Sequence, residues 1–526
     1  MALDDQPTGN TAEKQKHMKR GRACFNCRRR KMRCDGVLPV CTQCAQANRP
    51  DDCQYTFNGQ TAPAQVLQEN IKRVQGRINE LEQRGPSPTP VVKLQQPYQQ
   101  NQASSEPLGE LPMDTVTKLV DAFLSYSSEV GFFLHGARFR HAMLLPQPWG
   151  HPGRPAPVLV MAVYLWGLRL APNVDPQLVT QTPEVLARAL EILPTSISGS
   201  HPERVMHTLQ AEVLLAQYFF SANRFLEGKY HATNAASLTL ANGLHIVRSQ
   251  NKPSVLPPPR DSIEEGERVH AFWSVLNLDK TWSVALDTNA YQNVQDPTCT
   301  VDTPWPLEPE EYERGQPNPG ALYSNTVNKW IEGQPTSDLG LSLSALLSKS
   351  AMMLQRANKF SREYKPGRPD ANFYAYDLLI EDLRGLLPSL KSFKHSTPGK
   401  WRTMFLAHSF VFGAMIQLHG TTALGDNPKS REKRMFAAQA VLDLVLAIPP
   451  QLDRHLDYLH PVVGTVWTNA FQALIEETQV LRLSGSSTTV LAERLRGALS
   501  AIQRFKRACA LLEYQISAIE EALAAL

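Results

Sequence analysis

Six of the eight cysteines lie between residues 24 and 53, and no other feature of the 526-residue chain limits its folding so strongly. Their spacing is Cys24-x2-Cys27-x6-Cys34-x6-Cys41-x2-Cys44-x8-Cys53. A structural zinc site needs four ligands, so six thiolates are too many for one ion and too few for two separate ions. Two zinc ions are saturated if two thiolates bridge them. The repeated Cys-x2-Cys halves suit such a pseudo-symmetric site.

A disulfide framework is the alternative for a cysteine-rich segment. No apolar N-terminal segment resembles a signal peptide, so we do not expect the oxidising secretory route. The strongest apolar run, Val158 to Leu168, ends at Arg169 and is too short to span a bilayer. We therefore expect a soluble intracellular protein with no membrane partner, whose clustered thiols bind metal.

Positive charge is concentrated at the N-terminal end. Between Lys14 and Arg33 there are ten basic residues and no acidic ones. Residues 1–62 hold eleven Lys and Arg against six Asp and Glu, a net charge of +5, which leaves about −1 for the rest. This asymmetry predicts a module that binds a polyanion. Residues 1–22 read as a disordered basic arm, and Lys14–Arg22 has the composition of a nuclear localisation signal or a phosphate-binding arm.

The stretch from Ala23 to Gly36 resembles the Zn₂Cys₆ binuclear cluster of fungal transcription regulators. The resemblance covers all six ligands, the basic run between the second and third ligands, and Pro39 two residues before the fourth. It implies a DNA-binding domain over 23–54 that holds two zinc ions per chain, with Cys24 and Cys41 as bridges. One ion would be held by Cys24, Cys27, Cys34 and Cys41, and the other by Cys24, Cys41, Cys44 and Cys53.

The resemblance also implies that double-stranded DNA is the partner. A short helix over 25–33 is expected to enter the major groove and to read guanine-containing triplets of the CGG type. Lys31 is the first choice for a base contact and Arg30 the second, although Arg30 is less typical of the family. Phosphate contacts, which fix register without reading sequence, are expected from Arg22, Arg28, Arg29 and Arg33.

A dimerisation helix is predicted over 67–84, after a linker at 55–66. Its apolar residues alternate in steps of four and three, as in a coiled coil that favours parallel dimers: Leu67, Ile71, Val74, Ile78 and Leu81. Gly76 costs such a helix roughly 1 kcal/mol. A lone amphipathic helix docked on the larger domain is the alternative. The position just behind the cluster is where the family dimerises, which favours a homodimer.

The rest of the chain is predicted to be helical. Residues 85–112 are rich in Pro, Gln and Ser and read as a disordered linker. From 113 to 526 helical periodicity predicts an all-α domain, with Ser262 and Glu265 as a capping box at the start of one helix. The predicted helices are 114–127, 156–171, 182–193, 203–222, 226–246, 262–285, 338–363, 368–391, 399–424, 428–448, 459–484 and 487–524.

Several stretches of residues 115–310 resemble the fungal-specific transcription factor domain, also called the middle homology region. They include the segments 131–135, 227–231, 240–245, 264–275 and 302–306. The resemblance implies a regulatory domain that works with the transcription machinery or co-regulators. It also leaves room for a small-molecule effector in a pocket lined by Trp273 and Trp282.

Catalytic motifs are missing from the helical part. It contains no Gly-x-x-x-x-Gly-Lys, Gly-x-Ser-x-Gly or His-Glu-x-x-His sequence. Its histidines (His135, His231, His245 and His270) are scattered, Trp166 reads as core, and Cys299 and Cys509 read as ordinary thiols. We therefore expect no enzyme but a nuclear, sequence-specific regulator of transcription by RNA polymerase II. A DNA-independent helical scaffold with a structural zinc cluster is the alternative, and the intact basic run disfavours it.

Overall fold

A computed structural model describes residues 23–55, 68, 71–77, 79 and 111–526. The last range has gaps at 172–174, 254, 293–299, 316–319, 337, 366–370, 394–395, 424–426 and 449–457. The predicted arm 1–22, the linker segments 56–66 and 85–110, and three seam residues (Leu67, Ile78 and Leu81) lie outside the described residues. Cys299 does so as well.

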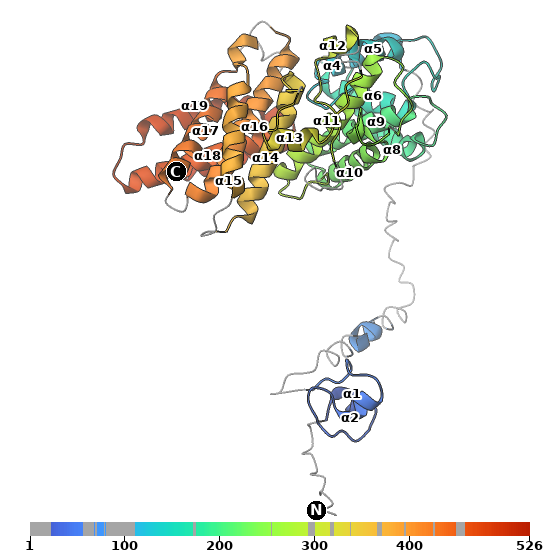
Figure 1. Cartoon of the computed structure of the whole chain (residues 1–526), viewed down its shortest axis with the longest axis vertical. Helices are drawn as coiled ribbons and strands as arrows, with labels where there is room; N and C mark the ends of the chain where they lie inside the picture. The colour runs from blue at the N-terminus through green and yellow to red at the C-terminus, as the bar shows by residue number, and fades with distance from the viewer. Residues whose placement is uncertain are drawn as a thin grey trace, which may run out of the picture. The chain divides into compact units, whose positions relative to one another are not determined.

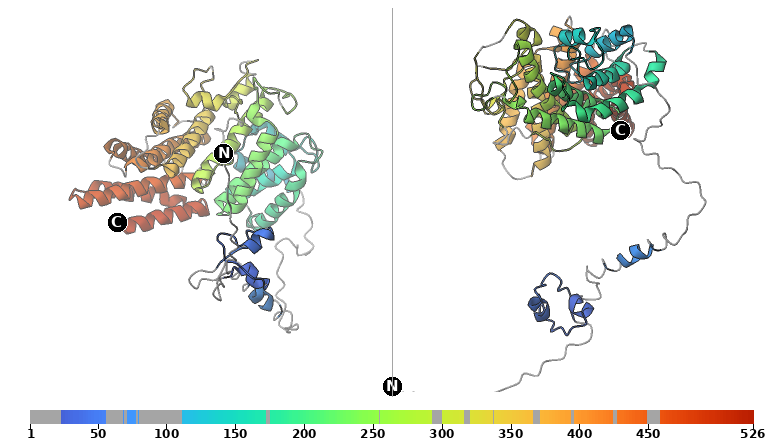
Figure 2. Two further views of the ribbon diagram at one scale, coloured as in Figure 1. Left: turned by 60° about the horizontal axis from the view of Figure 1, so that its bottom comes forward. Right: turned by 90° about the vertical axis from the view of Figure 1, so that its right-hand side faces the viewer.

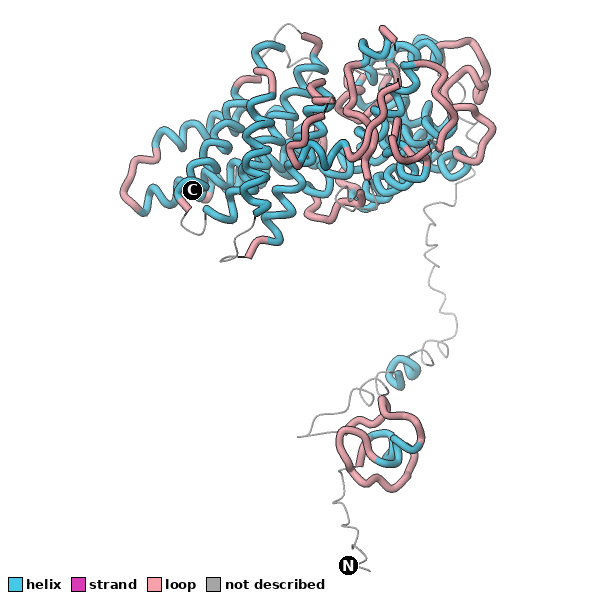
Figure 3. The backbone as a smooth tube through the Cα atoms, in the orientation of Figure 1, coloured by secondary structure: helices cyan, strands magenta, loops and turns pink. Residues whose placement is uncertain are grey.

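The chain divides into two units, Met1–Ser104 and Ser105–Leu526. The described residues of both units form helices and loops without any strand (Figure 3), as the sequence predicts for the fold class. The first unit has two short helices, α1 (Phe25–Arg29) and α2 (Thr42–Gln46). Residues 71–77 are helical too, and Ile71 and Val74 there are 62% and 56% exposed.

The second unit, the helical body, begins with helices that pack around one hydrophobic cluster: α4 (Met113–Leu124), α5 (Gly136–Met143), α6 (Pro157–Leu170), α7 (Pro176–Thr180), α8 (Thr182–Ser196) and α9 (Arg204–Ser221). Next come α10 (Phe225–Ala241) and η1 (Leu244–Ile246), whose buried residues belong to a second cluster.

A long helix and two short ones follow in the middle of the body: α11 (Ser262–Ala285), α12 (Pro309–Glu313) and α13 (Thr326–Ile331). The C-terminal part consists of α14 (Leu343–Glu363), α15 (Ala371–Leu386), η2 (Leu390–Phe393), α16 (Pro398–Ala423), α17 (Pro428–Leu446), α18 (Val462–Leu483), α19 (Thr489–Gln503), η4 (Arg504–Arg507) and α20 (Ala510–Ala524).

Two hydrophobic clusters fill the body. One lies among α4, α6 and α8, and the other, larger cluster extends from α9 and α11 to α14, α16, α17 and α18. Figure 1 and the left view of Figure 2 show the first group (teal to green) at one end and the last helices (orange to red) at the other. Helix α11 lies between them and contacts α9, α10, α12, α14 and α18.

Helix α6 holds the first cluster together. Its apolar run is buried on every side, including the side chain of Trp166, and Pro157 begins it at the position where a missing N–H costs nothing. Gly167 lets α4 approach closely, because a Cβ there would lie 2.7 Å from the backbone oxygen of Leu119. The strongest apolar run of the sequence is therefore a core helix, and no helix among the described residues is long and apolar enough to cross a membrane.

Two sequence expectations about helix ends in the body are wrong. The cap of α11 is Asp261, whose carboxylate accepts a hydrogen bond from the Glu264 amide at 2.9 Å. Ser262 instead donates its hydroxyl to the carbonyl of Tyr312 at 2.7 Å, so it is not the cap. The predicted helix 487–524 is two helices, because the chain turns at 504–509 to bury Phe505 and Cys509.

Two histidines of the body are buried in the neutral form. Burial lowers the pKa of His270 and that of His460 to about 4. His270 donates through Nε2 to the carbonyl of Leu307 at 2.9 Å. His460 accepts through Nδ1 from the Val462 amide at 3.3 Å. Because the unfolded chain binds these protons near pH 6.5, acid favours unfolding.

We expect the body to lose stability as the pH falls from about 6.5 to 4, by about 1.4 kcal/mol per pH unit for each such histidine. The substitution His460→Asn keeps an acceptor for Val462 but cannot take up a proton. Its thermal midpoint, followed by circular dichroism, should therefore depend less steeply on pH than that of the wild type. His141→Asn, at an exposed position of α5, is the control. An unchanged slope in His460→Asn would contradict the prediction.

Candidate metal centre and nucleic-acid interface

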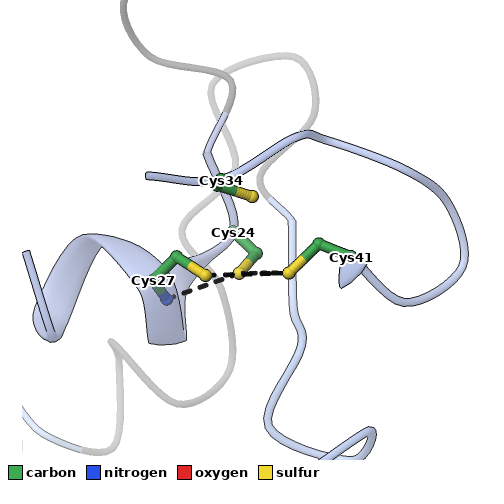
Figure 4. A group of neighbouring side chains, drawn as sticks. All are labelled: Cys24, Cys27, Cys34 and Cys41. Atoms are coloured by element: carbon green, nitrogen blue, oxygen red, sulfur yellow. Dashed lines mark hydrogen bonds between the residues drawn. The ribbon is translucent and has the colours of Figure 1, made fainter. Parts of the chain in front are cut away.

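All six clustered cysteines are buried and their sulfurs converge. The sulfur atoms form two groups, each within 4.8 Å: Cys24, Cys27, Cys34 and Cys41, and then Cys24, Cys41, Cys44 and Cys53. The four side chains of the first group face one another in Figure 4. These are the two ligand sets that the resemblance implies, with Cys24 and Cys41 in both.

The distances between the sulfurs fit zinc rather than disulfides. Cys24 and Cys41 are 3.7 Å apart, Cys27 and Cys41 3.6 Å, and Cys24 and Cys44 3.8 Å. Zinc–sulfur bonds of about 2.3 Å at tetrahedral angles separate two sulfurs by about 3.8 Å. A disulfide needs about 2.05 Å, and all six thiols are free. The donor set therefore fits two tetrahedral zinc ions that share two thiolates.

The site consists of two halves with the same backbone, residues 24–34 (the first half) and 41–53 (the second half). In the first half, Cys24 caps α1 and its sulfur accepts from the Cys27 amide at 3.4 Å. In the second half, Cys41 caps α2 and its sulfur accepts from the Cys44 amide, also at 3.4 Å. From Cys24 to the end of the turn each residue thus has a counterpart 17 positions later, as Cys24 has in Cys41, whereas Cys53 follows Cys34 by 19 positions.

Both halves end their helices in the same left-handed turn. Lys31 has φ +53° and Asn48 has φ +54°. The Met32 amide donates to the Cys27 carbonyl at 2.9 Å and the Lys31 amide to the Arg28 carbonyl at 3.2 Å, which is a Schellman motif. The second half repeats both bonds with the amides of Arg49 and Asn48.

The expected helix over 25–33 is therefore wrong in its length, because α1 ends at Arg29. A helix rises about 1.5 Å per residue, so a continuous helix would place Cys34 about 10.5 Å along the axis from Cys27. Both sulfurs lie within 4.8 Å of each other. The chain must therefore turn back before Cys34, and it does so at Lys31.

The basic run surrounds this turn. The side chains of Arg28, Arg29, Arg30, Lys31 and Arg33 are all exposed, and Arg28 donates to the Ala23 carbonyl at 3.4 Å. Arg28 and Arg29 occupy the last turn of α1, where cations are favourable beside the helix C-terminus. The second half has Ala45, Gln46, Ala47 and Asn48 at the equivalent positions. Positive charge is therefore concentrated in the first half of the site. Arg22 lies outside the described residues.

Three residues support the cluster that the sequence analysis did not single out. Asn26 is 2% exposed and donates to the Cys44 sulfur at 3.5 Å. The Asp35 carboxylate accepts from the Thr42 amide at 3.2 Å, and Tyr55 donates to the Val37 carbonyl at 3.1 Å. Only the adjacency of Asp35 to a ligand signals its role in the sequence.

Burial keeps the thiols of Cys24 and Cys27 protonated when no metal is bound. Burial raises the pKa of Cys27 to about 12 and that of Cys24 further. Burial opposes ionisation of Cys41 too, but hydrogen bonds from the Cys44 amide and the neighbouring thiols outweigh it and lower its pKa to about 6. Zinc binding must therefore displace protons, so its affinity falls in acid.

The histidines and the remaining described cysteine of the body form no comparable site. The Glu212 carboxylate is 2.6 Å from Nδ1 of His231, and Glu313 is 2.8 Å from Nε2 of His135. Cys509 is a buried free thiol, and Trp166, Trp273 and Trp282 are buried core side chains, as expected.

Comparison with known proteins agrees with this geometry. Residues 22–60 match the family described as the fungal Zn(2)-Cys(6) binuclear cluster domain. Among curated proteins, the citrinin biosynthesis transcriptional activator mrl3 of Monascus ruber is 23% identical over 359 residues. The alignment covers 58% of this chain and 67% of that relative.

A second relative, the citrinin biosynthesis transcriptional activator ctnR of Monascus purpureus, is also 23% identical over 359 residues. This chain spans 59% of its length. The cluster domain and these relatives indicate a zinc-binding transcription regulator, which is not an enzyme.

We expect metal removal to unfold the cluster and to leave the helical body intact. Zinc supplies about 10–16 kcal/mol to small domains of this kind, and few apolar residues could replace it. In the background Cys299→Ser, the zinc-loaded chain should contain two zinc ions and resist alkylation. A chelator should expose six cysteines to alkylation, counted by mass spectrometry, without changing the thermal midpoint of the body. One zinc ion per chain would contradict the bridged site.

Proposed function

We propose, from the premise that this chain carries a fungal Zn(2)-Cys(6) cluster domain and is homologous to fungal transcriptional activators, that it binds specific sequences in double-stranded DNA. It acts in the nucleus on genes transcribed by RNA polymerase II. In this proposal the cluster domain reads DNA, residues 67–84 pair two chains, and residues 113–526 form the regulatory domain that receives co-regulators or a small-molecule effector.

The observation that carries the proposal is the charge difference between two halves with the same backbone. Both halves place a residue in a left-handed turn at the end of a short helix, but only the first half surrounds it with arginines. Lysine donates to guanine O6 and N7, whereas arginines nearby bind phosphates. The end of α1, rather than its flank, therefore enters the major groove, with Lys31 on the bases and Arg30 beside it.

The remaining cations fix the register. Arg28, Arg29 and Arg33 are exposed around the turn. They contact phosphates, together with Arg22. The two triplets of a paired site are of the CGG type, and the segment 55–66 sets their separation.

We expect binding-site selection with the zinc-loaded full chain to enrich paired CGG-type triplets. Lys31→Ala should lose the guanine preference, at a cost of about 1–3 kcal/mol. Asn48→Ala, at the equivalent turn of the second half, should select the same sites as the wild type. Unchanged selection by Lys31→Ala would refute its role. No enrichment at all from chain with two zinc ions would favour the DNA-independent scaffold.

The dimer in this proposal rests on two apolar side chains that are exposed on the helix over residues 71–77. Ile71 and Val74 lie three residues apart on a helix and are 62% and 56% exposed. This spacing places them on the same face, where a second helix would cover both. A parallel homodimer buries the predicted seam and brings two cluster domains to one DNA site.

We expect the wild-type full chain to sediment as a dimer and Ile71→Asp to sediment as a monomer, because a charge in the seam has no partner. Analytical ultracentrifugation measures this directly. Lys72→Asp, on the outer face of the same helix, is the matched control and should remain dimeric. A wild-type monomer would instead support a helix that docks on its own chain.

A further inference from the structure

A cavity of about 430 Å³, partly open to solvent, lies in the helical body where its two hydrophobic clusters meet. Its walls come from residues 127–137 and from α11, α12, α14 and α16, with one residue of α9 and His460. Gly266 lets the ring of Tyr312 lie against α11, because a Cβ there would be 2.6 Å from Cγ of that ring. The volume is in the range of cavities that enclose small molecules.

Helix α11 turns a polar stripe toward this cavity. The lining residues alternate in steps of three and four, so they share one face of the helix: Glu267, His270, Ser274, Asn277 and Thr281. The rest of α11 is largely buried. Polar side chains that are removed from water destabilise a fold unless they form hydrogen bonds with the protein or with a ligand.

Glu267 and His270 each use one hydrogen bond to hold the wall and keep a second acceptor atom, and Asn277 also offers an acceptor. The Glu267 carboxylate accepts from the His135 amide at 2.8 Å through Oε1. His270 donates through Nε2 to a carbonyl, so its neutral ring has Nδ1 left as an acceptor. Oδ1 of Asn277 is buried and has no hydrogen-bond partner among the described residues.

Among the described residues Glu267 pairs with no lysine or arginine, unlike three buried glutamates of the body. On the same helix, Glu264 pairs with Arg268 at 2.6 Å and Glu265 pairs with Arg248. Within the cavity wall, Glu129 pairs with Arg402. Glu267 contacts only an amide among the described residues, and no lysine or arginine is among the residues that line the cavity.

The arginines near Glu267 pair with other carboxylates. Arg138 pairs with Asp261 at 3.0 Å, and Arg260 pairs with Glu203 at 2.7 Å. Burial raises the pKa of Glu267 and the charge of Glu203 adds to this effect, while the His135 amide and the charges of Arg138 and His135 lower it. Among the described residues no lysine or arginine forms a salt bridge with Glu267.

We propose that this cavity binds an apolar organic amine, with the protonated amine at Glu267 and the hydrocarbon part against Trp273, Tyr312 and Phe410. The aromatic wall favours a cation as well as apolar contact, whereas a carboxylate ligand would meet an uncompensated negative charge. The inference rests on the proposed regulatory function for its biological consequence, since the amine would be the effector. Trp282, expected at the pocket, does not line the cavity.

The test uses the zinc-loaded full chain without DNA and three probes with the same ring system. These are 2-naphthylmethylamine, 2-naphthylmethanol and 2-naphthoate, titrated by isothermal calorimetry. The amine should bind about tenfold more tightly than the alcohol, because it adds a charged hydrogen bond, and the naphthoate should not bind. Thr403→Trp, which fills the cavity from a half-buried position of α16, should abolish binding of the amine and the alcohol.

Glu267→Gln keeps the acceptor for His135 and removes the charge. It should lose the tenfold preference for the amine and keep the affinity for the alcohol, and its unchanged thermal midpoint would show an intact fold. Glu310→Gln, which removes an exposed carboxylate outside the cavity, should bind like the wild type.

Three outcomes would overturn the proposal: no binding of the amine by the wild type, naphthoate binding as tight as amine binding, or an undiminished amine preference in Glu267→Gln. The same titrations with Lys31→Ala separate the two proposals, since that variant should lose DNA selection and bind the amine normally. If the wild type selected no DNA sequence, the proposed function would be contradicted and the cavity measurements would still stand.

Discussion

The separation between sulfurs that zinc requires determines the conformation of the cluster domain. Cys27 and Cys34 must lie within 4.8 Å, and this excludes a helix through the basic run. The chain turns at Lys31 instead, in a left-handed conformation that costs a side chain of this type about 1–2 kcal/mol. Zinc binding offsets this cost several times over. The metal thus holds the proposed base-reading residue in a conformation that the free peptide would avoid.

The two halves of the cluster domain share a backbone conformation but differ in their side chains, and these two properties serve different purposes. The two halves supply equivalent caps, turns and bridging sulfurs, which make the metal site. The arginines and Lys31 of the first half have small or neutral counterparts in the second. Because the helix and turn have the same backbone in both halves, the proposed DNA contacts of the first half depend on these side chains and not on the fold.

Sequence reasoning succeeded where the constraint is local. The spacing of the cysteines predicts the metal site, and the apolar run of α6 predicts a helix almost to the residue. It failed where contacts between residues far apart in the sequence determine how a helix begins or where it lies. Asp261 and Ser262 are both good caps, and a contact with Tyr312, fifty residues away, leaves the cap to Asp261. The short helix α12 depends on the space that Gly266 leaves beside α11, which no periodicity reveals.

The difference in composition between α6 and α11 supports a binding role for the cavity. Both helices are buried on nearly all sides, and α6 is apolar apart from Arg169 in its last turn, as burial alone would select. Helix α11 instead keeps Glu267, Asn277 and His270 on the face that lines a cavity, and an apolar residue at any of them would relieve the desolvation of a polar group. The polar stripe costs desolvation free energy, recurs at each turn of the helix and keeps hydrogen-bond acceptors without partners among the described residues. A bound ligand explains such a stripe, whereas the stability of the fold does not.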